Sequence, residues 1–314
     1  MTTTKSSSLP VGINPIEKAQ FLLGKTLYNG SNQLQRKLLG ARKKELEGIH
    51  YLELGDPKNP PLGFFHGFGD SKDGYLLSSF PLVKDYYLIV PDMPGFGENP
   101  EDSQAYYNMQ HMVTLLGKFF ESLQLDAFTL IGNSMGGAIS MAFTLAYPTQ
   151  VKKLVLLDSA GFFYRDIPSV FHEFAAGKNI FDIETKEDYR NLLNRVFFKV
   201  PYIPKVVFNF LYHHINSKRE WYGKMVGDLT NRLESLEQKE EIELFTFNNK
   251  VCEIRCPTLL LWGEYDSLFP AEVAKRATPL FSEGQLGLLK KTGHAPQYEA
   301  PRQYMRALKQ FIIS

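Results

Sequence analysis

The sequence has only two cysteines among its 314 residues and no long apolar run. Cys252 and Cys256 stand four positions apart, without the further Cys or His ligands of a zinc site or a disulfide framework. No stretch approaches the ~18 apolar residues of a membrane span, and "MTTTKSSSLPVGINP" lacks the apolar region of a secretory signal. We therefore expect reduced thiols and a cytoplasmic location.

The sequence also lacks a large net charge, but its charges are unevenly distributed. The formal net charge is +1, which argues against a general role in binding nucleic acid. Residues 1–44 nevertheless carry +7, because Glu17 is their only acidic residue. Their basic residues are Lys5, Lys18, Lys25, Arg36, Lys37, Arg42, Lys43 and Lys44. With 44% apolar residues, the chain has the composition of a globular protein with a sizeable core.

Short apolar runs alternate with helical patterns from residue 48 onward, as in parallel βαβ units. The runs predict strands over 48–54, 62–66, 86–91, 126–131, 153–158, 257–262 and 285–290. The helical patterns predict helices over 104–123, 136–147, 271–279 and 301–312. Several strands are almost continuously apolar, which is typical of strands covered on both faces. The sequence therefore predicts an open, mostly parallel sheet, with ligands at the carboxyl ends of its strands.

One interval between predicted strands is too long for a single crossover. Asp158 and Pro257 are 99 positions apart, whereas a crossover needs roughly thirty residues. The intervening segment is rich in aromatic residues and in long helical patterns. We expect residues 162–245 to form a helical cap over the carboxyl edge of the sheet.

A serine flanked by glycines follows the strand predicted at 126–131. Residues 132–136 read "GNSMG", which fits the pattern G-x-S-x-G, and a helix is predicted directly after them. Such a tight strand-to-helix turn needs small flanking residues and exposes the serine hydroxyl above the helix N-terminus. The helix N-terminus favours a negative charge that develops there. The sequence therefore predicts that Ser134 is a nucleophile.

A serine nucleophile requires a histidine base. His294 lies in "LLKKTGHAPQYEAP", after the last predicted strand and before the last predicted helix. This loop belongs to the carboxyl edge of the sheet, from which a base reaches Ser134. The other histidines fall on predicted strands, on a helix or in the long insertion. We expect His294 to be the base.

The base in turn requires an acid to orient it. Asp266 follows the penultimate strand, 28 residues before His294, and gives the chain order Ser, Asp, His. Asp158, at the end of the strand before the insertion, is the main alternative. We expect Asp92, in "VPDMPGFGEN", to fix its own Pro/Gly turn instead.

The reaction also requires an oxyanion hole. The loop "FFHGFGDSKDG" allows the backbone N–H of Phe68 to point at the substrate oxygen, together with that of Met135, the residue after the nucleophile. Each donor contributes ~3 kcal/mol to stabilising the transition state. The chain lacks the G-x-x-x-x-G-K-[ST] pattern of a phosphate-binding loop. We expect neither a metal ion nor an organic cofactor.

With these motifs in place, residues 45–314 resemble serine hydrolases of the α/β-hydrolase fold. The strings "HGFGDSKD", "PDMPGFGE", "GNSMGGAIS", "LDSAGFF" and "TGHAPQYEAP" are most similar to those of capped bacterial esterases and lipases related to monoacylglycerol lipases. The resemblance implies an α/β core formed by residues 45–161 and 246–314, with the helical cap inserted after the sixth strand. It also implies cleavage of carboxylic esters through an acyl-serine intermediate, with medium-chain acyl esters or monoacylglycerols as substrates.

Two alternative functions stay open on the sequence alone. Carbon–carbon bond hydrolases of aromatic ring-cleavage products also resemble this chain through "GNSMGG", although Ala295 stands where they usually have Trp. A non-catalytic, ligand-binding member of the fold is the second alternative, but such proteins have typically lost a residue of the triad. All three residues are present here.

The resemblance implies that the cap forms the acyl pocket. The expected lining residues are Phe162, Phe163, Phe197, Phe198 and Phe208, and Phe171, Phe174, Phe210 and Trp221 are further candidates. At helical spacing, however, an aromatic residue is more often part of the core.

The basic N-terminal segment has an amphipathic pattern. Apolar residues occur at helical spacing, at Ile16, Ala19, Leu23 and Leu27 and again at Leu34 and Leu38, and we expect a break at Gly30 and Ser31. Two interpretations stay open for residues 16–44. They form either an interfacial helix on anionic lipid or a helix packed on the hydrolase core with solvated charges.

Overall fold

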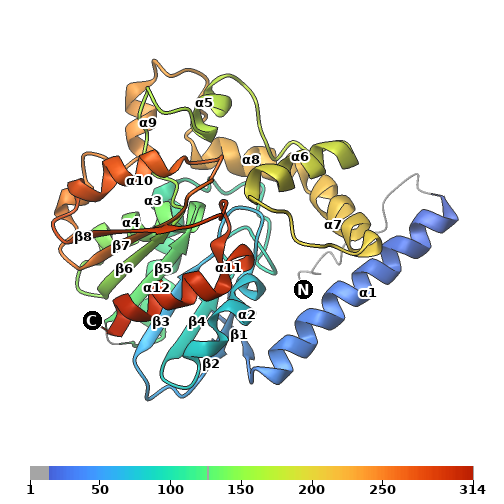
Figure 1. Cartoon of the computed structure of the whole chain (residues 1–314), viewed down its shortest axis with the longest axis horizontal. Helices are drawn as coiled ribbons and strands as arrows, with labels where there is room; N and C mark the ends of the chain where they lie inside the picture. The colour runs from blue at the N-terminus through green and yellow to red at the C-terminus, as the bar shows by residue number, and fades with distance from the viewer. Residues whose placement is uncertain (1–13, 126, 314) are drawn as a thin grey trace.

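The computed structural model in Figure 1 describes residues 14–125 and 127–313. Its centre is an eight-stranded sheet with the strand order β1-β2-β4-β3-β5-β6-β7-β8. β2 runs antiparallel to β1 and β4, and all other neighbouring strands are parallel. The strands are β1 (Arg42–Leu46), β2 (Ile49–Leu54), β3 (Pro61–Phe65), β4 (Tyr87–Pro91), β5 (Phe128–Asn133), β6 (Val151–Leu157), β7 (Thr258–Gly263) and β8 (Gly284–Leu289). The mostly parallel sheet is confirmed, and each predicted strand lies within two residues of an observed one.

The sequence pattern misses β1, because this strand has no apolar run. It reads "RKKEL" and is almost wholly exposed at the edge of the sheet. A turn with Gly48 at φ +74° joins it to β2. Arg42 and Lys44 lie 3.4 and 3.0 Å from the buried carboxylate of Glu53 on β2. The expectation of a helical arm up to residue 44 is therefore wrong at its end, where the chain has already entered the sheet.

The sheet is covered on both faces, and its strands alternate between two apolar cores. On β6, Leu154 and Leu156 belong to the core under one set of helices, while Val155 and Leu157 belong to the core on the opposite face. The first face is covered by α3 (Met109–Ser122), α4 (Met135–Ala146) and α10 (Ala271–Ala277). The second is covered by α2 (Leu76–Ser79) and α12 (Pro301–Ile313), and α11 (Pro296–Glu299) precedes α12. This burial explains the continuous apolar runs of the central strands.

The predicted insertion consists of helices that lie above the carboxyl edge of the sheet (Figure 1). All of them stand between β6 and β7 in the chain. They are α5 (Val170–Ala175), α6 (Lys186–Val196), α7 (Lys205–Ser217), α8 (Arg219–Leu229) and α9 (Lys239–Phe245). We call these five the cap helices. Residues 14–125 and 127–313 contain no helix with both the length and the apolar character needed to cross a bilayer.

The N-terminal segment forms one continuous helix, α1 (Pro15–Leu38). The expected break at Gly30 and Ser31 is wrong. Glycine costs a helix only about 1 kcal/mol, and tertiary contacts hold α1 on both sides of this point. Phe21 packs against Phe210 of α7, with ring centroids 5.4 Å apart, and Arg36 forms an ion pair with Asp73.

Candidate active site

Ser134 lies at the turn between β5 and α4, in a backbone conformation that is rare for a non-glycine residue. Its φ is 53° and its ψ −119°. The neighbouring glycines permit this turn because there is no room for side chains. A Cβ on Gly132 would lie 2.4 Å from the carbonyl oxygen of Gly136, and a Cβ on Gly136 would lie 2.2 Å from the carbonyl oxygen of Phe65. The backbone N–H of Ser134 donates to the carbonyl oxygen of Leu157, which ties the turn to β6.

His294 and Asp266 are in direct contact. The Nδ1 of His294 lies 2.8 Å from the Oδ2 of Asp266, and both side chains are almost completely buried. The other oxygen of Asp266 accepts hydrogen bonds from the backbone N–H groups of residues 268–269, at 2.8 and 3.1 Å. Asp266 thus has a fixed orientation, and it orients the imidazole of His294. Ser134 and His294 line the same cavity.

The loop that carries His294 is held by residues that the sequence analysis does not identify. The side chain of Asn133, next to the nucleophile, donates to the carbonyl oxygen of Leu157 at 2.9 Å and accepts from Gln297 at 3.2 Å. The backbone N–H of His294 donates to the carbonyl oxygen of Val196, at the end of α6. These partners lie far apart in the chain, so no local sequence pattern reveals them.

The loop that contains Phe68 begins at His66, which hydrogen bonds hold on both ring nitrogens, and continues into a tight turn. The Nε2 of fully buried His66 accepts a hydrogen bond from the backbone N–H of Met93 at 2.9 Å. His66 therefore carries its proton on Nδ1, which donates to the carbonyl oxygen of Gly67 at 2.8 Å. The same carbonyl oxygen accepts from the N–H of Asp70 and so closes a turn with Phe68 at its tip. This turn lies against the nucleophile, since a Cβ on Gly67 would lie 3.4 Å from that of Ser134.

Asp92 anchors this loop as well as its own turn. Its carboxylate accepts from the backbone N–H of Glu98, as expected from the Pro/Gly pattern. It also forms a buried ion pair with Lys72, at 2.6 Å. Burying a charge is costly unless it is paired and hydrogen-bonded. The pair therefore fixes the distance between the two loops that flank the site.

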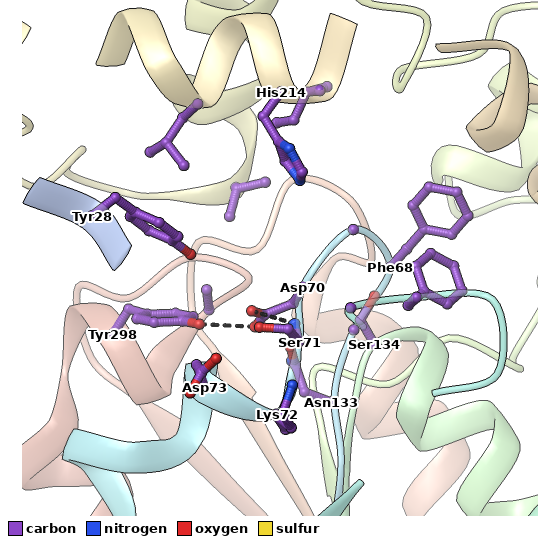
Figure 2. A pocket seen from close by; sticks show the side chains of 18 of the residues that line it. Tyr28, Phe68, Asp70, Ser71, Lys72, Asp73, Asn133, Ser134, His214 and Tyr298 are labelled. Carbon is purple, nitrogen blue, oxygen red and sulfur yellow. Dashed lines mark hydrogen bonds between the residues drawn. The ribbon is translucent and has the colours of Figure 1, made fainter. Parts of the chain in front are cut away.

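A cavity of about 630 Å³ extends from Ser134 and His294 to the N-terminal helix. Figure 2 shows its polar side, where Tyr298 and Tyr28 point toward Asp70, and His214 points in from α7. The hydroxyl of Tyr298 donates to Asp70 at 2.8 Å. Burial raises the pKa of the Asp70 carboxyl and lowers the pKa of His214 to about 4, which keeps its imidazole neutral. The N-terminal helix contributes Tyr28, Asn29, Asn32, Gln33 and Arg36 to the wall.

A second, smaller cavity of about 70 Å³ also reaches Ser134. Apart from Ser134 and Thr230, the side chains around it are apolar. They include Phe68, Met109, Met135, Ala138, Val170, Phe171, Phe174, Ile180, Phe181, Val226, Leu229, Phe245, Leu268 and Phe269. The serine hydroxyl therefore stands between a small apolar cavity and a large cavity with a polar wall.

Of the five phenylalanines expected to line an acyl pocket, only Phe197 borders either cavity. Phe162 is fully buried in the core, and Phe163 is partly buried against the same core. Phe208 packs against Tyr189 within the cap, and Phe198 is half-exposed beside Tyr265. Phe162, Phe163 and Phe208 follow the alternative interpretation, in which aromatic residues at helical spacing fill a core, whereas Phe198 borders neither cavity and is exposed. Phe171 and Phe174 do reach the apolar cavity.

The comparisons with known proteins agree with this geometry. Residues 60–188 match the model of the alpha/beta hydrolase fold family. Lipase 1 of Psychrobacter immobilis is 31% identical over 251 residues, which cover 80% of this chain and 76% of the lipase. The monoacylglycerol lipase abhd6-B of Xenopus laevis is 27% identical over 277 residues, covering 84% and 79% of the two chains.

A solved structure and a second group of relatives extend these comparisons. The crystal structure of a membrane phospholipase A described as a bacterial virulence factor superimposes with a TM-score of 0.84 at 27% identity. It covers 93% of this chain and 92% of the phospholipase. Hydrolases of 2-hydroxy-6-oxo dienoates are also similar to this chain, at 23% to 26% identity.

Proposed function

This chain belongs to the alpha/beta hydrolase family and is an ester-cleaving serine hydrolase, and on this premise we propose that Ser134, His294 and Asp266 form its catalytic triad. His294 takes the proton from Ser134 as the hydroxyl attacks the ester carbonyl. Asp266 holds the imidazole in the tautomer that accepts this proton at Nε2, and it stabilises the resulting cation. The 2.8 Å contact between Asp266 and His294, beside the turn at Ser134, is the observation that supports this assignment most strongly.

The same reaction requires stabilisation of the tetrahedral oxyanion. The backbone N–H groups of Phe68 and Met135 supply it. The alcohol then leaves, an acyl-Ser134 remains, and water activated by His294 releases the acid. The strained conformation of Ser134, with φ at 53°, suits a side chain that must present its hydroxyl at a fixed point.

The two cavities bind the two parts of the ester, on either side of the bond that is cleaved. The small apolar cavity takes the acyl chain, because burying each methylene contributes ~0.8 kcal/mol. The large cavity takes the alcohol, whose free hydroxyls match the polar wall around Asp70 and Tyr298. The lipase relatives support medium-chain acyl esters and monoacylglycerols as the proposed substrates.

The carbon–carbon hydrolase alternative receives less support. Relatives with that activity are less similar to this chain than Lipase 1 is. Ala295 follows His294 where those enzymes usually carry Trp. A dienoate ring-cleavage product offered as substrate separates the two activities directly.

Initial rates on p-nitrophenyl esters and on mono-, di- and triacylglycerols test the proposal. We expect kcat/KM to rise about fourfold per acyl methylene until the apolar cavity is full, and monoacylglycerols to react faster than triacylglycerols. Ser134→Ala should lower kcat by ~10⁶-fold without unfolding the protein, and His294→Ala should do the same. If Ser134→Ala keeps a tenth of the wild-type rate, or if rates fall beyond acetate, the proposal is wrong.

We also propose that α1 contacts a lipid surface. Its two faces differ: Phe21, Gly24, Tyr28 and Arg36 face the protein, and the opposite face carries a stripe of exposed apolar residues. We call Ile16, Leu23, Leu27, Leu34 and Leu38 the α1 stripe, and each is between 49% and 72% exposed. The apolar pattern seen in the sequence is thus not the face that packs on the protein. A stripe of this kind suits a helix lying in a membrane interface, and it places the cavity beside a lipid substrate.

A further inference from the structure

A second buried aspartate lies beside Asp266 and His294. Asp158 directly follows β6 and is fully buried. Its φ is +44°, a backbone conformation that a non-glycine residue rarely adopts. Side-chain atoms of Asp158, Asp266 and His294 lie within 4.8 Å of one another. Asp158 takes no part in the proposed reaction, although its burial and its backbone conformation are unusual for an aspartate.

The two carboxyl groups receive different numbers of hydrogen bonds. Asp266 has three partners, namely the backbone N–H groups of residues 268–269 and the imidazole of His294. Asp158 accepts one hydrogen bond, from the backbone N–H of Gly263 to its Oδ1 at 2.7 Å. Within the part of the chain that the structure describes, no N–H or O–H group donates to its Oδ2. Hydrogen bonds from donors stabilise the ionised form of a carboxyl group, so Asp266 is the member of the pair that holds the negative charge.

Two carboxylates this close together in a buried site cannot both be ionised. Burial is the main cause that raises the pKa of Asp158 well above its usual value, and the neighbouring charge of Asp266 adds to it. Glu299 of α11 acts in the same direction. Buried Tyr75 donates from its hydroxyl to the carbonyl oxygen of Phe65 at 3.4 Å. Burial is the main cause that raises its pKa, so it stays neutral.

We propose that Asp158 is a positioning residue that remains protonated and donates a hydrogen bond from its unpartnered oxygen to the carboxylate of Asp266. This bond gives Asp266 a further partner besides His294 and the two backbone N–H groups. It thereby keeps the carboxylate of Asp266 aligned on the Nδ1 of His294 while the imidazole carries the proton taken from Ser134. The inference rests on the roles proposed above for Asp266 and His294.

Infrared spectroscopy of the full-length protein at pH 7 tests the protonation directly. We expect the carbonyl stretch of a buried, protonated carboxylic acid in the wild type and its loss in Asp158→Asn. The matched control is Asp85→Asn, which alters an exposed aspartate and should keep the band. Absence of the band from the wild type overturns the proposal. Because the measurement needs no turnover, the spectrum of Ser134→Ala gives the same answer whether or not the proposed reaction is correct.

The pH dependence of kcat/KM tests the positioning role. The amide of Asp158→Asn is neutral and still donates a hydrogen bond, so this variant should keep kcat within about threefold, with the acid limb of the profile unmoved. Asp158→Ala removes the donor and should lower kcat by about tenfold or more, with KM unchanged. Melting temperatures check that each variant folds. Where Asp158→Ala does not fold, the Asp158→Asn profile decides.

Two outcomes contradict the role. If Asp158 were ionised, Asp158→Asn would remove a negative charge beside His294. Removal of that charge would disfavour the protonated imidazole, and the acid limb of the profile would move to lower pH. Loss of wild-type activity on dialysis against a chelator, restored by a divalent cation, would likewise show that a metal ion rather than a proton joins the two carboxylates.

Discussion

At the scale of single residues, the polar wall of the large cavity is the feature that distinguishes this site. Tyr28 comes from α1, Asp70 from the loop after β3, and Tyr298 from α11 (Figure 2). The Asp70 and Tyr298 pair has space only because residue 74 is glycine, where a Cβ would lie 2.2 Å from the Tyr298 hydroxyl. The groups offer both donors and acceptors for the hydroxyls of a polyol.

We predict that Tyr298→Phe lowers kcat/KM for monoacylglycerols by about tenfold relative to p-nitrophenyl esters of the same acyl chain. The Tyr298 hydroxyl donates to Asp70, so it meets a substrate hydroxyl as an acceptor. Such a neutral hydrogen bond contributes up to about 1.5 kcal/mol, and 1.4 kcal/mol is a factor of ten. The aromatic leaving group has no hydroxyl to lose a partner, so its rate should stay within about twofold. Tyr202→Phe, at a residue that is 91% exposed, is the control. Equal losses on both substrates would indicate a structural role for the hydroxyl.

The residues of the site differ in how far the sequence reveals them. Ser134, Asp266 and His294 each follow an apolar strand and are recognised from local pattern and chain order. The contacts of Asn133 with Gln297, and of Tyr298 with Asp70, join residues more than 160 positions apart. Only the folded chain brings such residues together. The phenylalanines of the cap show the converse problem, because apolar spacing does not tell a cavity wall from a core.

At the scale of elements, the contact between α1 and α7 positions the residues of α1 that line the large cavity. Gly24 of α1 lies so close to α7 that a Cβ would stand 2.0 Å from the carbonyl oxygen of Val206. Gly30, six residues later, has nothing within 4 Å of such a Cβ. The two glycines of one helix therefore have opposite environments.

We predict that Gly24→Ala destabilises the protein by about 2 kcal/mol, as overpacking does, and that it lowers monoacylglycerol turnover because Tyr28 is displaced. Gly30→Ala is the matched control. It should raise the free energy of unfolding by up to about 1 kcal/mol, because alanine favours a helix. Urea denaturation measures both changes. If the two substitutions had the same effect, α1 would not be packed on α7 as described.

The strands and helices also differ in how well the sequence predicts them, because some depend on contacts with distant residues. The strands from β2 to β7 are visible because burial makes them apolar. β8 is visible from its leucines, although Leu286 and Leu288 are exposed at the edge of the sheet. β1 is not visible, because it is a charged edge strand whose lysine and arginine pair with Glu53. The sequence pattern likewise does not show that α1 continues through Gly30, because this depends on the contacts of α1 with α7 and with the loop after β3.

At the scale of the whole molecule, the +7 charge of residues 1–44 is partly neutralised by three carboxylates of the fold. Lys5 lies outside the described residues. Arg36 pairs with Asp73, Lys43 with Glu98, and Arg42 and Lys44 with Glu53. The α1 stripe, by contrast, has its apolar side chains exposed along the whole helix. Attraction to a membrane therefore depends on apolar contact more than the sequence alone suggests.

We predict that the triple variant Leu23→Ser, Leu27→Ser and Leu34→Ser partitions onto vesicles with anionic lipid at least tenfold less than the wild type. Full burial of one leucine contributes about 1.5–3 kcal/mol, so partial insertion of three exceeds the 1.4 kcal/mol of a tenfold change. Leu244→Ser is the control, since Leu244 is 58% exposed on α9, away from α1.

Co-sedimentation at low and at high salt measures the partitioning. The ion pairs of Arg36, Arg42, Lys43 and Lys44 predict a weaker salt dependence than a charge of +7 would give, because less uncompensated charge is left to be screened. Partitioning that disappears at high salt, or that the triple variant leaves unchanged, would show that α1 does not bind lipid through its leucines.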